Sequence, residues 1–289
     1  MRVVLAGQGA MGSALADGLA ESDHELVGLL VQKRRWLGIG DALQRRARGL
    51  RIPVVQLGEP WSLAALKPDL LLCGDFGSIL GTEWLEIPTI GGINAHWSLL
   101  PRHRGPDPAA SVILAGDRES GLTFHVLTKR IDGGAILDQT RFSVGERDTT
   151  ARVYHQASRL AAERLGPVLD AVASDGLTGQ PQDLTQGSYR RRLTEAETAV
   201  HWNATAAEID RLVRACTRPM AHFVYKGQTI FLSACTPVEG SGTPGEVLAA
   251  DPLVIATGAG ALRIERALTL MPPFTWPGWP TLRRGASVL

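Results

Sequence analysis

The first 140 residues alternate short, almost wholly apolar runs with longer segments of helical periodicity, and this alternation limits the fold more than any other feature. Such runs lie at 3–6, 26–31, 52–55 and 69–73, and turn residues bound them. Apolar runs without a polar face are typical of strands that are buried on both sides, as in a parallel sheet covered by helices. We therefore predict an α/β domain with a doubly wound, mostly parallel sheet.

The chain continues with two more expected strands and a long helix. The strands are predicted at 122–127 and 135–140, around the pair Gly133-Gly134, and the helix at 151–173, where apolar residues recur on one face. A polar stretch rich in turn residues follows at 174–187. We place the first domain at 1–185 and a linker at 186–200.

The last third of the chain has a different pattern of predicted elements, mostly short strands. One helical segment is expected at 206–216, and short strands are expected at 223–225, 229–232, 245–248, 253–256 and 261–264. Short strands separated by regular turn signals favour a small barrel or sandwich. We predict that 201–289 form this second, smaller β domain, with a Pro- and Trp-rich tail at 271–280.

Composition excludes several classes of protein. A formal net charge of +1 in 289 residues, with 44% hydrophobic and 20% charged residues, excludes a disordered chain or one that is basic throughout. No run is long enough to span a membrane, and the N-terminus enters the first strand without a signal-peptide pattern. The three cysteines are far apart, and no His lies at a metal-ligand spacing, so we predict a cytoplasmic protein without a metal.

The first expected strand ends in a glycine motif. Gly7, Gly9 and Gly12 have the GxGxxG spacing between a strand and a helix, where backbone amides bind a pyrophosphate in dinucleotide-binding proteins. The usual acidic partner at the end of the second strand is missing, which disfavours NAD. Lys33 and Arg34 stand there instead and suit the extra phosphate of NADP, while the alternative is that the glycines only let the helix pack close to the sheet.

The segment 91–105 contains the residues best suited to catalysis. A strand that includes Asn94 and His96 projects both side chains on one face, because alternate residues of a strand point the same way. An amide donor stabilises a developing oxyanion, and an imidazole donates a hydrogen bond or relays protons. This pair therefore suits acyl transfer to an amine.

The same segment resembles the N10-formyltetrahydrofolate-dependent formyltransferase family, of the methionyl-tRNA formyltransferase and amino-sugar N-formyltransferase type. The matching motifs are Asn-Ala-His at 94–96, SLLPRHRG at 98–105 and the Asp-x-Gly loop at 132–137. Residues 219–225 and 256–262 look like the C-terminal domain of these enzymes. The resemblance implies a catalytic, folate-binding domain at 1–185, an OB-like β domain at 201–289 and N10-formyltetrahydrofolate as co-substrate.

The resemblance also implies a role for each matching residue. Asn94, His96 and Asp132 fall on the catalytic triad of the family. The Asn94 amide and a protonated His96 then face the formyl oxygen, while Asp132 favours the cationic imidazole and takes up the proton of the amine. The pterin slot falls at 75–80 and 131–136, from which we select the following candidate contacts: Phe76, Ile79, Leu80, Ile131, Gly133, Gly134 and Ile136. Core packing is the alternative for Phe76, Ile79 and Leu80.

Four further residues are candidates for binding the acceptor. They are Gly9, Met11, Arg104 and Asp107. Asp107 stands where the family commonly has small residues, and it would bind an ammonium or hydroxyl group of a polar acceptor. Its alternative role is to cap a helix.

The acceptor itself is less well indicated than the reaction. Residues 182–289 hold 11 Lys and Arg against 9 Asp and Glu, and a domain that embraces tRNA is expected to be more basic. Basic residues at 33–51 and 190–192 form either a solvated face or a rim for phosphates. We favour a small-molecule amine, such as an amino sugar or a natural-product intermediate. Methionyl-tRNA, a carrier-bound amine, hydrolysis of the formyl-folate and an NADP-dependent reduction remain alternatives, and the oligomeric state is not indicated.

Overall fold

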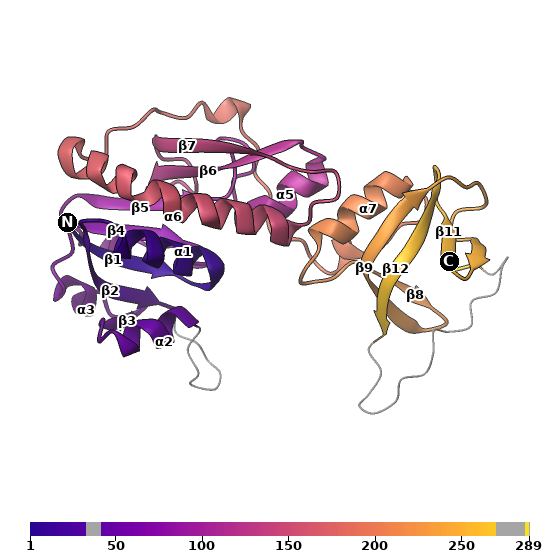
Figure 1. Cartoon of the computed structure of the whole chain (residues 1–289), viewed down its shortest axis with the longest axis horizontal. Coiled ribbons are helices and arrows are strands. Elements are labelled where there is room, and N and C mark those ends of the chain that lie inside the picture. The colour runs from indigo at the N-terminus through magenta and orange to yellow at the C-terminus, as the bar shows by residue number, and fades with distance from the viewer. Residues whose placement is uncertain (33–41, 270–286, 289) are drawn as a thin grey trace. The chain divides into compact units, whose positions relative to one another are not determined.

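The computed structural model of the chain describes residues 1–32, 42–269 and 287–288, which form two compact units (Figure 1). The first unit contains Met1–Val112, Arg118–Val144 and Ala151–Arg191. The second unit contains Ile113–Asp117, Gly145–Thr150 and Arg192–Leu289. Each unit has its own hydrophobic core.

A seven-stranded sheet in the order β3-β2-β1-β4-β5-β6-β7 forms the centre of the first unit. The strands β1 to β5 pair in parallel, whereas β6 and β7 are antiparallel to their neighbours. Their bounds are β1 Arg2–Gly7, β2 Glu25–Val31, β3 Val54–Gln56, β4 Leu70–Gly74, β5 Gly91–His96, β6 Glu119–Val126 and β7 Ile136–Ser143. The predicted mostly parallel, doubly wound sheet is confirmed.

Helices cover both faces of this sheet (Figure 1). The helices of this part of the chain are α1 Gly9–Ala20, α2 Ala42–Gly49, α3 Pro60–Ala64, α4 Thr82–Leu85, α5 Pro108–Ala115 and α6 Thr150–Asp175. Successive residues of β1 serve opposite faces: Val3 and Leu5 belong to the cluster that contains apolar residues of α1 and α6, and Val4 belongs to the cluster of α3 and α4. Burial on both faces explains why the strand sequence lacks a polar face.

The glycine motif lets α1 begin close to the sheet. A Cβ atom on Gly7 would lie 3.0 Å from the Cα of Gly12, and one on Gly12 would lie 3.0 Å from the carbonyl carbon of Gly7. The close-packing explanation of the motif therefore has direct steric support. Lys33 and Arg34, which suggested NADP, lie outside the described residues, as does the expected tail at 271–280.

The second unit is built on a five-stranded antiparallel sheet in the order β10-β11-β12-β9-β8. Its strands are β8 His222–Tyr225, β9 Gln228–Val238, β10 Val247–Ala250, β11 Leu253–Ala256 and β12 Ala261–Thr269. The helix α7 Ala206–Ala215 packs against it and begins with a capping box formed by Thr205 and Glu208. The predicted small β domain is thus confirmed, and the predicted helix at 206–216 corresponds to α7.

One segment that is distant in the sequence, Gly145–Thr150, contributes side chains to the second unit. Arg147 Nη1 lies 2.8 Å from Asp210 Oδ1, and the Thr150 hydroxyl donates to the carbonyl oxygen of Ala215 at 2.8 Å. Arg214 Nε donates to the other oxygen of Asp210 at 2.7 Å. The buried carboxylate of Asp210 therefore has two guanidinium partners, one of them from the segment between β7 and α6.

Candidate active site

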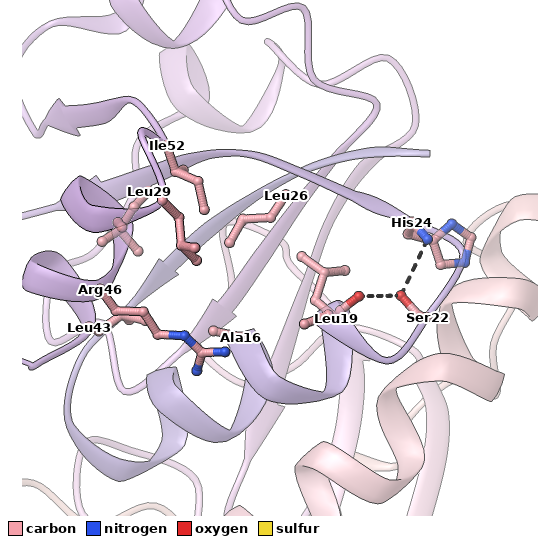
Figure 2. Close-up of a pocket in the computed structure, with 12 residues that line it drawn as sticks. Ala16, Leu19, Ser22, His24, Leu26, Leu29, Leu43, Arg46 and Ile52 are labelled. Atoms are coloured by element: carbon pink, nitrogen blue, oxygen red, sulfur yellow. Dashed lines mark hydrogen bonds between the residues drawn. The ribbon is translucent and has the colours of Figure 1, made fainter.

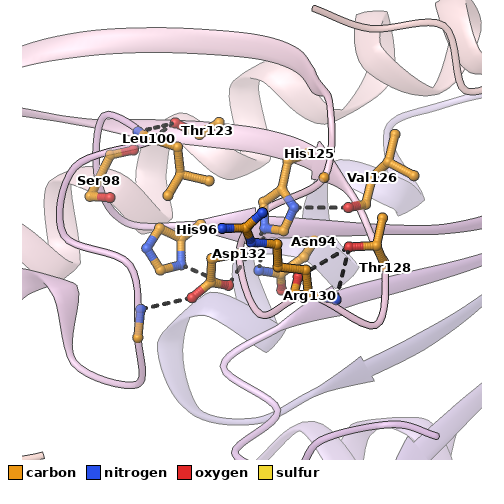
Figure 3. Close-up of polar contacts among 12 residues, drawn as sticks. Asn94, His96, Ser98, Leu100, Thr123, His125, Val126, Thr128, Arg130 and Asp132 are labelled. Atoms are coloured by element: carbon orange, nitrogen blue, oxygen red, sulfur yellow. Dashed lines mark hydrogen bonds and ion pairs between the residues drawn. The ribbon is translucent and has the colours of Figure 1, made fainter. Parts of the chain in front are cut away.

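The carboxyl end of β5 positions the two predicted donors. Asn94 and His96 are alternate residues of this strand, and both side chains extend toward the loop that contains Asp132 (Figure 3). On the antiparallel neighbour β6, the Cα partners of Asn94 and His96 are His125 and Thr123. Asn94 and His96 thus lie on one face, as their spacing indicates.

Asp132 lies in the loop between β6 and β7. Its backbone has φ 49°, in the left-handed region that Asp tolerates better than most residues. The amide of Gly105 donates to Asp132 Oδ2 at 2.8 Å, and Oδ1 lies 3.6 Å from His96 Nδ1. The carboxylate is only 13% exposed, so its interaction with His96 is poorly screened. The structure therefore brings Asp132 to the pair on β5.

The contacts of His96 determine which of its nitrogens faces the carboxylate. Nε2 lies 3.0 Å from the backbone carbonyl oxygen of His103. A carbonyl only accepts, so Nε2 carries a hydrogen and Nδ1 is the atom that faces Asp132. A proton gained by this ring goes to Nδ1, where it forms an ion pair with Asp132.

His125 is part of the site, although no motif of the sequence indicates it. Its Nε2 lies 3.1 Å from Asn94 Nδ2 and 3.7 Å from Asp132 Oδ1, and its Nδ1 donates to the carbonyl of Val126 at 3.0 Å. Burial, and then the charge of His96, lower the pKa of His125 to about 4 against the opposing effect of Asp132. His125 is therefore neutral at neutral pH.

The register of β5 and β6 is the signal that would have revealed His125. The run 122–127 indicates a strand, and a polar residue in a buried strand is unusual. Only the pairing of His125 with Asn94 shows why it is there.

The candidate folate contacts have different environments. Phe76 is buried in the cluster that contains β4, and Leu80 packs against the same cluster. Ile79 and Ile131 are 77% and 43% exposed. Ile136 begins β7 and exchanges two backbone hydrogen bonds with Gln180, each 2.8 Å long.

The two loop glycines differ in how closely they are packed. A Cβ on Gly134 would lie 1.8 Å from the carbonyl oxygen of Val126, whereas one on Gly133 would meet only the flexible side chain of Arg130, at 2.9 Å. The loop between β6 and β7 can therefore follow its path only if residue 134 is glycine.

The candidate acceptor contacts lie in three places. Gly9 has φ 60° at the start of α1, and the Met11 side chain is fully buried, so only backbone atoms of Met11 are available to a ligand. Arg104 forms backbone hydrogen bonds with Ser188 and Arg190. Asp107 Oδ1 accepts from the amide of Ala110 at 3.3 Å, which is the helix-capping contact foreseen as its alternative role.

Asp75 and Tyr154 form a second polar group, at the end of β4. The Tyr154 hydroxyl donates to Asp75 Oδ2 at 2.6 Å, and a Cβ on Gly9 would lie 3.2 Å from that oxygen. Burial and the charge of Asp75 raise the pKa of Tyr154, and the charge of Asp107 raises it further. Two carboxylates thus lie around one phenol. The carboxyl ends of β1 and β4, between which the strand order reverses, are where open α/β sheets bind ligands.

An apolar pocket of about 150 Å³ lies elsewhere in the first unit (Figure 2). It is lined by residues of α1, β2 and α2, including Leu19, Leu29 and Leu43, and by none of the candidate site residues. This pocket is therefore separate from the Asn94 site. Within 1–32, 42–269 and 287–288, no group of three His, Cys, Asp or Glu residues is arranged to hold a metal ion, and no helix is long and apolar enough to cross a membrane.

Comparison with known proteins identifies the family. The formyl transferase family matches residues 60–169, and the formyl transferase C-terminal domain matches residues 192–270. The methionyl-tRNA formyltransferase of Pseudomonas entomophila (strain L48) is 38% identical over 283 residues, covering 92% of this chain and 90% of the relative.

Two solved structures share the fold. An N-formyltransferase from Helicobacter canadensis, in complex with folinic acid and dTDP-3-aminofucose, has a TM-score of 0.73 at 18% identity, over 93% of this chain and 100% of that one. HypX from Aquifex aeolicus, in complex with tetrahydrofolic acid, has a TM-score of 0.68 at 21% identity. That match covers 92% of this chain, which spans only 44% of HypX. Two matched family domains and a relative aligned over most of both chains establish that this chain belongs to the formyl transferase family and is a formyltransferase.

Proposed function

We propose that this enzyme transfers the formyl group of N10-formyltetrahydrofolate to a primary amine of a small, polar molecule. The observation that carries the proposal is the cluster of Asn94, His96 and Asp132 at the carboxyl end of β5, with Asp132 Oδ1 3.6 Å from His96 Nδ1. An amide donor, an imidazole and a carboxylate within reach of one another are the groups that acyl transfer to nitrogen requires.

The chain's own residues supply both charge stabilisation and proton transfer. As the amine nitrogen attacks the formyl carbon, negative charge grows on the formyl oxygen. The Asn94 amide donates to that oxygen, and a protonated His96 stabilises the same charge. Asp132 pairs with the His96 cation and accepts the proton that the attacking nitrogen loses, directly or through water. The bond between the formyl carbon and N10 of the folate then breaks, and N10 takes up the proton that the attacking nitrogen lost, which releases tetrahydrofolate and the formamide.

Exposed apolar side chains support the assignment of the formyl donor. Ile79 and Ile131, two candidate pterin contacts, expose 77% and 43% of their surface in loops, and exposed apolar groups of this kind are typical of ligand sites. When bound, the donor supplies the activated one-carbon group. The folate ligands of the Helicobacter canadensis enzyme and of HypX favour the same class of donor. We also place the enzyme in the cytoplasm, in keeping with three cysteines that form no disulfide.

Two carboxylates near the switch point of the sheet suit a cationic or hydroxyl-rich acceptor. Asp75 and Asp107 both act on Tyr154, next to the loop that contains Gly9. Carboxylates attract an ammonium ion and accept from hydroxyl groups, but they repel phosphates. The excess of only two basic residues in 182–289 points the same way.

Methionyl-tRNA is the second candidate acceptor. The relative that is 38% identical over 283 residues is a methionyl-tRNA formyltransferase, and the sequence similarity extends into the C-terminal domain. Hydrolysis of the formyl-folate is a further possibility for the same three side chains, with water in place of the amine.

One experiment separates these functions. The purified enzyme is incubated with N10-formyltetrahydrofolate and, in turn, with a panel of amino sugars and nucleotide-linked amino sugars, with methionyl-tRNA, and with no amine. Mass spectrometry then follows a gain of one formyl group, and a second assay follows formate. Formylation of a small amine supports the proposal, formylation of the tRNA alone replaces the acceptor, and formate release without amine identifies a hydrolase.

A further inference from the structure

We propose that His125 is a positioning residue that sets the orientation of the Asn94 carboxamide and so presents one amide N–H to the formyl oxygen. The inference rests on the proposed function, because it concerns how the same site works. Its basis is the hydrogen-bond chain that runs from the Val126 carbonyl through the His125 ring to Asn94 (Figure 3).

The direction of this chain follows from its fixed end. The Val126 carbonyl can only accept, so the Nδ1 atom of His125, 3.0 Å away, carries a hydrogen. A neutral ring then has a lone pair at Nε2. The group that faces this lone pair must be a donor, which is the Nδ2 amide of Asn94 at 3.1 Å and not its carbonyl oxygen.

One hydrogen of the Asn94 Nδ2 amide is thus bound to His125, and the second hydrogen is left to donate to the formyl oxygen. Without the His125 acceptor, the carboxamide can rotate by 180° and present its oxygen where charge builds on the formyl oxygen. Two oxygens with negative character would then repel each other, and the stabilising donor would be lost. The backbone places His125 for this task, since it is the Cα partner of Asn94 on β6.

The contact with Asn94 also keeps the His125 ring neutral. A proton on Nε2 of His125 would point at the amide hydrogen of Asn94, so the hydrogen bond disfavours it. Burial of the ring, whose side chain is only 2% exposed, disfavours it as well and helps to lower its pKa to about 4. Asp132 lies between both rings, 3.6 Å from His96 and 3.7 Å from His125, and the His125 ring stays neutral beside it.

Two amide substitutions separate the functions of the two ring nitrogens. In His125→Gln the side-chain amide reaches the position of Nε2 and can accept from Asn94. In His125→Asn the amide reaches only the position of Nδ1, keeps the contact with Val126 and leaves Asn94 without an acceptor. With the amine acceptor found for the wild type, we expect His125→Asn to lower kcat about 10-fold or more, and His125→Gln to stay within about 3-fold, with both KM values within about 2-fold.

A double-mutant cycle tests whether His125 acts through Asn94. If it does, His125→Asn adds less than about 2-fold to the loss already caused by Asn94→Ala, because the group that it orients is gone. A merely structural role predicts that the two losses multiply. His24→Asn is the matched control: the side chain of this histidine in the first unit is also only 6% exposed, and it contacts the N-terminus and Asp170 away from the site. It is expected to change the melting temperature but not kcat.

A measurement on the wild-type enzyme keeps the inference testable if a variant does not fold. Side-chain ¹⁵N NMR is expected to show His125 as the neutral Nδ1–H tautomer at pH 7. The Nε2–H tautomer, or equal kcat values for the Gln and Asn variants, would overturn the inference. Failure of the wild type to formylate any amine or tRNA would instead refute the proposed function, so the two failures are distinguishable.

Discussion

At the scale of single residues, the site is a group of four polar side chains: Asp132 lies 3.6 Å from His96 and 3.7 Å from His125, and His125 lies 3.1 Å from the Asn94 amide. Asn94 and His96 could be selected because alternate residues of a strand point the same way, and Asp132 because its loop resembles the Asp-x-Gly motif of the family. His125 could not, because its role depends on which residue lies opposite on the next strand, and one sequence does not contain that register. The left-handed backbone of Asp132 was likewise not foreseen.

Replacing either donor on β5 should remove most of the activity. We expect Asn94→Ala and His96→Ala each to lower kcat about 100- to 1,000-fold, because a donor aimed at a developing oxyanion contributes about 3–4 kcal/mol. Circular dichroism should show a retained fold. Near-normal rates in both variants would remove these residues from the mechanism.

Asp107 permits a test of the acceptor site. Its side chain accepts from the Ala110 amide, so Asp107→Ala should destabilise the protein by about 1 kcal/mol through the lost cap. If the carboxylate also binds the acceptor, the KM for the amine rises while the KM for the folate stays constant. Asp107→Ser is the matched variant, because it retains a cap without the charge. An unchanged KM for the amine in both variants would leave Asp107 with the cap alone.

The stability of the protein should depend on pH through His125. Its pKa in the folded protein is about 4, below the ordinary value of 6.5, so the unfolded chain binds the proton first as the pH falls. Stability is complete above about pH 6.5 and is lost as the pH falls toward 4, by about 2 kcal/mol between pH 7 and pH 5. Urea unfolding at both pH values measures this loss. His125→Gln lacks the titrating group, and an equal loss in that variant would contradict the assignment.

At the scale of elements, the strand order concentrates function at one edge of one sheet. Gly9 and Asp75 follow the carboxyl ends of β1 and β4, and Asn94 and His96 lie at the carboxyl end of β5, which is parallel to them. The antiparallel strands β6 and β7 then supply His125 and the Asp132 loop. The predicted strands and helices indicate this architecture. They do not indicate that the Val126 carbonyl of β6 packs against Gly134 in the loop that contains Asp132.

The loop between β6 and β7 offers a matched pair of glycines. In Gly134→Ala the new methyl group meets the Val126 carbonyl, so we expect a loss of about 3 kcal/mol or a displaced Asp132 with little activity. In Gly133→Ala only the side chain of Arg130 has to move, and stability should change by less than about 1 kcal/mol. Thermal melts and kcat of the two variants make the comparison. Equal behaviour would show that the packing at residue 134 does not hold the loop.

At the scale of the whole molecule, the boundaries between units do not follow the order of the sequence. The change in composition and turn signals predicts a domain division at 186–200, because both are local properties of the sequence. In contrast, Gly145–Thr150 belongs to the second unit through contacts that are distant in the sequence, such as the hydrogen bond from Arg147 to the Asp210 carboxylate 63 residues later. No local pattern contains that information.

The Arg147 contact should contribute to the stability of the second unit. Arg147→Ala leaves buried Asp210 with Arg214 as its remaining guanidinium among the described contacts, and we expect a loss of about 1–3 kcal/mol. Arg141→Ala removes an ion pair in which both side chains are more than half exposed, and it should cost less than about 1 kcal/mol. Hydrogen exchange of α7, read by mass spectrometry, compares them. Equal protection of α7 in both variants would contradict the expected role of Arg147.

The scattered origin of the second unit also bears on how genes for such enzymes can recombine. After a single crossover near residue 192, the five-stranded sheet comes from one parent, whereas the Ile113–Asp117 and Gly145–Thr150 segments of the same unit come from the other. Hybrids made in this way inherit a mismatched set of partners for Asp210 and Ala215 unless both parents agree there. Exchange of the C-terminal third between relatives should therefore give stable hybrids more often when those two short segments are exchanged with it.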